Sequence, residues 1–211
     1  MRIYFFAGAL LLLAGIVFVA TRSTPPEHPD PELAKIDRLE RKKDAAGLIE
    51  ALKSQREDVV CRAAVALAHV SGKGAKPNLE GLLSDPRLSV RGTAADQFAI
   101  VSDRGDIGPL LPLFKAEKDP KAKAVFASAL GQNQGWEGMT VLVPALDDPN
   151  GDVRKAAAQA VLRITGLKPS ITDKSTPAER KRVVAQLNSN MPGMKARYEN
   201  YWQSKPAKEK K

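Results

Sequence analysis

Small and apolar residues recur in the same order four times along the middle of the chain. The four aligned segments begin at Val59, Val90, Ala122 and Val153, a regular spacing of the kind that marks a repeat architecture. In each segment the fifth, sixth, eighth and ninth positions are small or apolar, with Gln97 as the one polar exception. This pattern places the apolar positions on one face of an α-helix. Alanine at these positions also allows a neighbouring helix to approach closely.

A shorter apolar segment precedes each of these four helices. The four shorter segments span residues 44–54, 77–85, 107–119 and 139–148. Asp-Pro pairs separate the short segment from the long one in the last three copies. The repeating unit is therefore predicted to be helix, tight turn, helix. Pro112 and Pro144 fall inside two of the shorter helices and should bend them, because proline lacks a backbone donor.

Charged residues also recur with the period of the repeat. An acidic residue stands in each of the last three turns, and a basic residue follows at the second position of the long helix. The acids are Asp85, Glu117 and Asp148, and the bases that follow them in the long helices are Arg91, Lys123 and Arg154. Acids and bases repeated in this way are expected to pair between successive repeats as a structural ladder, which sets register more than it adds stability.

The motif VRxxAAxAL, the regular period and the acid–base ladder resemble the HEAT-like repeats first described in phycobilisome lyases. The resemblance covers residues 44–166. It implies an all-α fold, an armadillo-like α-solenoid of about four stacked antiparallel helix pairs whose second helices line a concave face. This agrees with the periodicity, because one helix pair cannot bury its apolar face without a neighbour.

The segments flanking the repeats are predicted to close the solenoid. Residues 32–43 form an N-terminal capping helix that Asp30 caps. Residues 167–204 form a helical C-terminal cap, in which Thr176 and Glu179 make a capping box. Pro192 and Gly193 should kink or split that helix. The segment resembles the TPEER…W helix that closes some bacterial HEAT-repeat proteins, and docking of a partner is an alternative role. Residues 205–211 are predicted to be a disordered basic tail.

The N-terminus carries an apolar stretch from Ile3 to Ala20 without a charged residue. This stretch is long enough to cross a bilayer as a hydrophobic helix. Residues 1–21 are therefore a transmembrane anchor or a cleaved signal peptide, and residues 22–31 are a proline-rich linker. Arg2 and the α-amino group favour a single pass with the repeats on the extracytoplasmic side. Cleavage would instead give a secreted or periplasmic protein.

The net charge of +9 is unevenly distributed. Residues 34–166 carry a net charge of only +3, whereas residues 167–211 carry +7. A nucleic-acid-binding protein usually gathers its basic residues on the folded body. The near-neutral repeats therefore argue against nucleic-acid binding, and attraction of the basic end to anionic lipid is a weaker alternative.

No motif for catalysis, phosphate binding or metal binding occurs in the chain. Cys61 is the single cysteine, and the two histidines are far apart in sequence. We therefore expect no metal ion, no cofactor and no small-molecule substrate. Residues on the outer ridge of the long helices remain available to a partner. These candidates are Cys61, His69, Lys155, Gln159 and Arg163.

Three functional hypotheses follow from these patterns. The first is a non-enzymatic scaffold that is anchored in a membrane and presents a helical surface to another protein. The second, implied only by the family resemblance, is a lyase or chaperone that acts on a tetrapyrrole-carrying partner. The third is a HEAT-like protein that binds nucleic acid. The N-terminal apolar stretch argues against the second and third hypotheses.

Overall fold

The computed structural model describes residues 28–206, which form helices and connecting turns without a strand. None of the helices in this range is both long enough and apolar enough to cross a membrane. The predicted hydrophobic helix, most of the proline-rich linker and the end of the basic tail lie outside the described residues. The all-helical prediction is confirmed for the described part.

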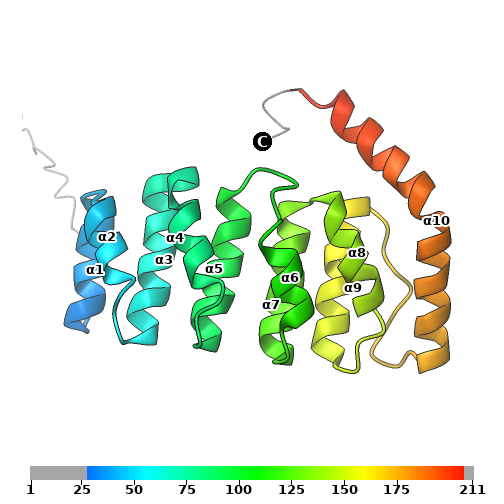
Figure 1. The fold of residues 1–211 in the computed structure, drawn as a ribbon, viewed down its shortest axis with the longest axis horizontal. Coiled ribbons are helices and arrows are strands. Elements are labelled where there is room, and N and C mark those ends of the chain that lie inside the picture. Colours follow the sequence, from blue (N-terminus) through cyan, green and yellow to red (C-terminus); the bar gives the residue numbers. More distant parts are fainter. Residues whose placement is uncertain (1–27, 207–211) are drawn as a thin grey trace, which may run out of the picture.

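Four helix pairs follow one another along the array (Figure 1). The shorter first helices are α2 (Ala45–Ala51), α4 (Lys76–Leu82), α6 (Leu110–Ala116) and α8 (Met139–Ala145). The longer second helices are α3 (Glu57–Ser71), α5 (Leu88–Val101), α7 (Pro120–Asn133) and α9 (Gly151–Thr165). The predicted unit of helix, turn and helix is thus confirmed in all four copies.

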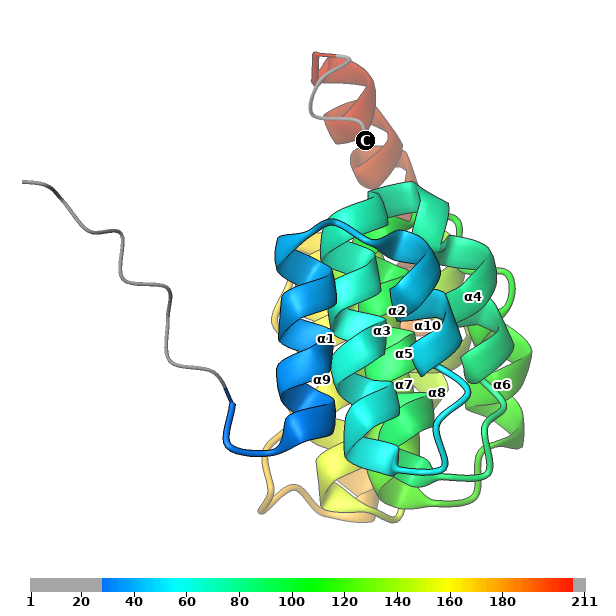
Figure 2. The ribbon, with the colours of Figure 1, turned by 90° about the vertical axis from the view of Figure 1, so that its left-hand side faces the viewer.

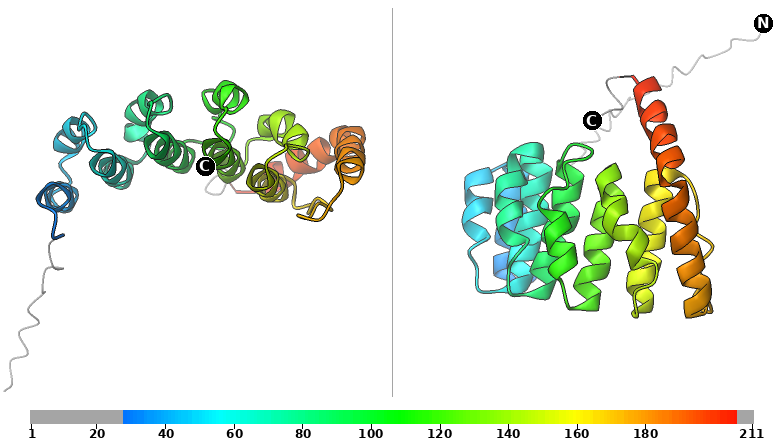
Figure 3. Two further views of the ribbon diagram at one scale, coloured as in Figure 1. Left: turned by 90° about the horizontal axis from the view of Figure 1, so that it is seen from below. Right: turned by 45° about the vertical axis from the view of Figure 1, so that its right-hand side comes forward.

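The helix pairs stack into two layers. Figure 2 looks along the array from the α1 end, with the first helices in one layer and α1 and the second helices in the other. Figure 3 shows that the layers form a shallow arch, and that the second helices line its inner side. This arrangement is consistent with the α-solenoid predicted from the repeats.

Alanine-rich faces bring the second helices together. Ala63, Ala94, Ala127 and Ala160 are all at most 1% exposed. Alanine combines the highest helix propensity with a small side chain, so it favours the helix and leaves room for its neighbour. The first helices instead contribute larger buried side chains to the same core, among them Leu79, Leu110, Phe114, Met139 and Leu142.

Gly131 marks the closest approach between two second helices, α7 and α9. A Cβ atom added at Gly131 would lie 2.5 Å from the Cα of Ala160. A separation this short is a clash with backbone, which a side-chain rotation cannot relieve. Gly92 lies on α5, the second helix of the repeat before α7. A Cβ atom there would meet the side chain of Val125 at 3.7 Å, an ordinary van der Waals distance.

Helices at both ends cover the open faces of the array. The first of them, α1 (Pro31–Arg41), is capped by the Asp30 side chain, which accepts hydrogen bonds from the backbone N–H groups of Glu32 and Leu33. At the other end, α10 (Pro177–Ser204) begins with the predicted capping box of Thr176 and Glu179. The predicted helix N-cap at Asp30 and the predicted capping box of Thr176 and Glu179 are confirmed.

The prolines meet the expectations only in part. α10 continues through Pro192 as one helix, so it is not split, and Figure 1 shows that it changes direction along its length. Pro112 lies in the first turn of α6, where the backbone N–H would have no intrahelical partner in any case. It therefore removes no hydrogen bond of that helix. Pro144 lies inside α8, one residue before its end.

The contrast between the two glycines gives a test of the packing. Gly131→Ala should lower the free energy of unfolding by about 1–3 kcal/mol, the usual range for overpacking a well-packed core. Gly92→Ala should leave it unchanged or raise it by up to about 1 kcal/mol, because alanine is the better helix former. Denaturant titration followed by circular dichroism measures both. Equal destabilisation by the two substitutions would contradict the close approach at Gly131.

Candidate functional site

The acid–base ladder lies on the turns between the helix layers. Arg91 Nε donates to Glu117 Oε2 at 3.0 Å, and Lys123 Nζ donates to Asp148 Oδ2 at 2.7 Å. Each pair joins the second helix of one repeat to the turn of the next. None of the four side chains is more than 26% exposed. These pairs are therefore shielded from solvent more than ordinary surface pairs are.

The other two residues of the ladder act within their own repeat. Asp85 pairs with Arg87 rather than with a base from the preceding repeat. Arg154 Nη1 donates to the backbone carbonyls of Asp148 and Pro149, and so it holds the turn before α9. Arg91 makes the equivalent pair of bonds to its own turn. The six residues therefore fix the turns and the register of the repeats.

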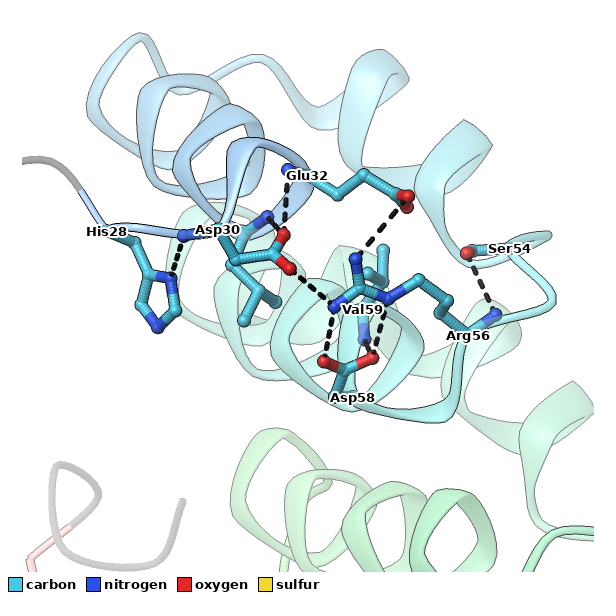
Figure 4. A network of polar contacts seen from close by, with 8 residues as sticks. His28, Asp30, Glu32, Ser54, Arg56, Asp58 and Val59 are labelled. Atoms are coloured by element: carbon cyan, nitrogen blue, oxygen red, sulfur yellow. Dashed lines mark hydrogen bonds and ion pairs between the residues drawn. The ribbon is translucent and has the colours of Figure 1, made fainter.

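Residues that sequence reasoning missed continue this pattern at both ends. At the N-terminal end, Arg56 bridges Asp30 and Asp58 at 2.8 and 2.7 Å and lies 3.5 Å from Glu32 (Figure 4). Hydrogen bonds from Arg56 hold the pKa values of Asp30 and Asp58 below their ordinary range. At the C-terminal end, Arg180 Nε donates to Asp147 Oδ1 at 2.8 Å.

The five candidate partner-facing residues do not form one cluster. Cys61 and His69 lie on α3, whereas Lys155, Gln159 and Arg163 lie on α9, with α5 and α7 between. Cys61 is half-buried, with its Sγ 3.8 Å from Ser89 Oγ. His69 is exposed, and its Nδ1 lies 3.0 Å from Glu40 Oε1 of α1.

A groove crosses the ends of all four second helices on the inner side of the arch. Its volume is about 770 Å³. Each repeat contributes residues from the C-terminal end of its second helix or from the following turn, and Trp202 of α10 adds to the lining. Ile100 lies in this groove and is 62% exposed. Arg163 also lines it, whereas Lys155 and Gln159 line a smaller pocket of about 170 Å³ beside residues 168–173.

An aromatic contact fastens α10 beside the groove. The Arg104 guanidinium carbon lies 3.6 Å from the centroid of the Trp202 ring, a cation–π distance. The Tyr198 hydroxyl donates to the backbone carbonyl of Gln134 at 2.8 Å, and the rings of Tyr198 and Trp136 lie 5.3 Å apart. These contacts join α10 to the loop after α5 and to the end of α7.

The buried side chain of Asn133 holds the loop that carries Arg104. Its Oδ1 accepts from the backbone N–H of Gly105 at 2.7 Å, and its Nδ2 donates to the carbonyl of Asp103 at 2.9 Å. Asn133 is 4% exposed, and it satisfies two backbone groups of a loop that has no regular structure. The sequence offered one signal for it, a polar residue near the apolar end of the third long helix.

Asp96 is a half-buried carboxylate on α5. Burial raises its pKa, and the charge of Arg163 opposes that rise. Among the described residues it has no hydrogen bond or ion pair. No cluster of three or more metal-binding side chains occurs in the described part of the chain.

Residues 45–131 match the family model for HEAT repeats. The match extends from α2 almost to the end of α7, and it supports a HEAT-repeat protein. Comparison with curated proteins found no match to this chain. HEAT repeats commonly serve as protein-interaction scaffolds and are generally non-enzymatic. These observations support an all-helical repeat protein that is similar to HEAT-repeat proteins over residues 45–131.

The partly buried ladder pairs should contribute more stability than an exposed pair. Glu117→Gln keeps the hydrogen-bond acceptor but removes the charge opposite Arg91, and it should cost about 1–3 kcal/mol, between the values typical of surface and buried pairs. Glu50→Gln removes the charge from an exposed pair with Lys53 and should cost less than about 0.5 kcal/mol. Urea titration compares the two. An equal loss would mean that the ladder contributes no more than a surface pair.

Asp96 should make stability depend on pH. Its pKa is raised in the folded protein above the ordinary value of 3.8. Its contribution to folding is therefore most favourable below that ordinary value and is lost as pH rises through the folded pKa. Asp96→Asn should be more stable than wild type at pH 7, and the difference should shrink towards pH 3. Asp173→Asn, an exposed aspartate, is the control. A smaller free energy of unfolding for Asp96→Asn at pH 7 would contradict this assignment.

Proposed function

We propose that this protein is a non-enzymatic scaffold whose inner face and adjoining groove bind another protein. The groove carries the proposal, because it combines residues from all four repeats with Trp202 and leaves Ile100 largely exposed. A concave surface shared by successive repeats is the binding surface that solenoid proteins typically use. The match to HEAT repeats supports the same class of function.

The proposal includes attachment of the protein to a membrane. Its support is the apolar stretch from Ile3 to Ala20, followed by the proline-rich residues 22–31. An anchor and an extended linker would display the repeats at a distance from the bilayer, on its extracytoplasmic side. If the stretch is instead cleaved as a signal peptide, the same repeats act as a secreted or periplasmic protein.

Nucleic-acid binding is the less favoured interpretation of the same surface. Residues 34–166 carry a net charge of only +3. A nearly neutral body attracts a polyanionic ligand weakly, because the affinity of such a ligand depends on neutralising successive phosphates. No observation on the described residues favours action on a tetrapyrrole.

Site-specific crosslinking in the native host tests the scaffold. A photoreactive amino acid at position 100 should capture a discrete protein partner, identified by mass spectrometry. The same amino acid at position 49, on first helix α2, is the control, because Ile49 is also exposed but lies in the outer layer. Identical adducts from both positions, or none from position 100, would argue against the groove as a binding site.

Alkaline carbonate extraction of the same cells tests the membrane anchor. Recovery of the protein in the cytosolic fraction would refute the anchor.

A further inference from the structure

A second pocket lies where the end of α9 meets the C-terminal part of α10. Its volume is about 560 Å³, and it shares Gln134, Arg163 and Trp202 with the groove. Tyr198, Tyr201 and Trp202 provide aromatic walls, and Met194, which is 3% exposed, adds an apolar surface. No acidic residue of the described chain lines this α9–α10 pocket.

Two arginines in the α9–α10 pocket are not engaged by the fold. Arg163 and Arg197 make no hydrogen bond or ion pair with another described residue, although the charge of Arg163 acts on Asp96. By contrast, Arg91 and Arg180 are each held by a carboxylate. A guanidinium presents donors in a planar fork that fits a carboxylate. The pocket therefore offers two such forks to a ligand from outside the described residues.

The aromatic walls indicate that the ligand also has an apolar group. Tyr201 is 54% exposed, an unusual position for a large ring that has no aromatic partner outside α10. Trp202 is braced by Arg104 and by its edge contacts with Tyr198 and Tyr201, so it forms a rigid surface. Tryptophan, tyrosine and arginine are the residue types that most often dominate the binding energy of protein interfaces.

The polarity of α9 selects among anionic ligands. The helix ends at Thr165, and Ile164, Thr165 and Gly166 line the pocket, so the end of α9 with its last backbone carbonyls borders the pocket. These carbonyls can accept hydrogen bonds from peptide N–H groups, and the negative end of the helix dipole disfavours a dense anionic charge. One or two carboxylates on a peptide fit better than a row of phosphates.

We propose that the α9–α10 pocket binds a short acidic peptide segment of the partner protein, with an aromatic side chain next to a carboxylate. The carboxylate pairs with Arg163 and Arg197, and the aromatic side chain packs against Tyr201 and Trp202. This inference rests on the proposed scaffold function and assigns the kind of partner sequence that the scaffold recognises.

Fluorescence anisotropy with labelled peptides tests the pocket. The full-length protein in detergent is titrated into a peptide that carries phenylalanine between two glutamates. One matched peptide replaces both glutamates with glutamine, and the other replaces the phenylalanine with serine. The first peptide should bind at least tenfold more tightly than either matched peptide. Arg163→Gln and Arg197→Gln should each weaken binding about tenfold, as expected for loss of a charge-assisted hydrogen bond. Tyr201→Ala should weaken the binding of peptides that carry phenylalanine and leave the binding of the serine peptide unchanged.

Arg182→Gln is the matched control, because it removes the same charge from α10 outside the pocket. It should change binding less than twofold, and circular dichroism checks that each variant remains folded. Equal binding of the three peptides, or unchanged binding by both pocket arginine variants, would overturn the proposal. Displacement of the peptide by a single-stranded oligonucleotide or by anionic vesicles, at lower concentration than by unlabelled peptide, would assign the pocket to phosphate instead.

Crosslinking from position 100 separates this proposal from the proposed function. If the adduct persists undiminished in the Arg163→Gln, Arg197→Gln double variant, the scaffold stands and the assignment of the pocket fails. If wild type itself gives no adduct, the scaffold fails, whatever the peptides do.

Discussion

Close contact between small residues in the inner layer is the constraint on which the rest of the molecule depends. Alanines on the second helices let these helices approach, and Gly131 removes even the last methyl group where α7 meets α9. The first helices pack through leucine, phenylalanine and methionine and need more space. Closer approach between the second helices than between the first helices curves the array towards the second helices, which agrees with the arch in Figure 3.

The features that the sequence predicts well are those that repeat or act locally. The alanine pattern is read from successive helical turns, and each cap depends on residues close to each other in the chain. The ladder can also be predicted from the sequence, because a constant repeat period brings equivalent turns side by side along the array. Only the partners of Asp85 and Arg154, at the ends of the ladder, could not be predicted from the repeat pattern.

The candidate site was much less predictable, because it is formed by segments that share no period. Arg104 and Trp202 are far apart in the sequence, and their contact depends on the direction that α10 takes and on the loop held by Asn133. Of the five candidate partner-facing residues on the long helices, only Arg163 lines the groove. The other four occupy comparable helical positions but lie elsewhere on the arch, since helical position alone does not specify where α10 covers the surface.

The contact between α10 and the repeats also determines what the protein's own ultraviolet emission reports. The chain has two tryptophans, Trp136 and Trp202, and both lie against Tyr198 at this one contact. Intrinsic fluorescence is therefore a local signal for the attachment of α10 and contains no tryptophan from the first two repeats. An unfolding transition followed by emission alone would describe one end of the array, and only its agreement with circular dichroism would establish that all repeats unfold together.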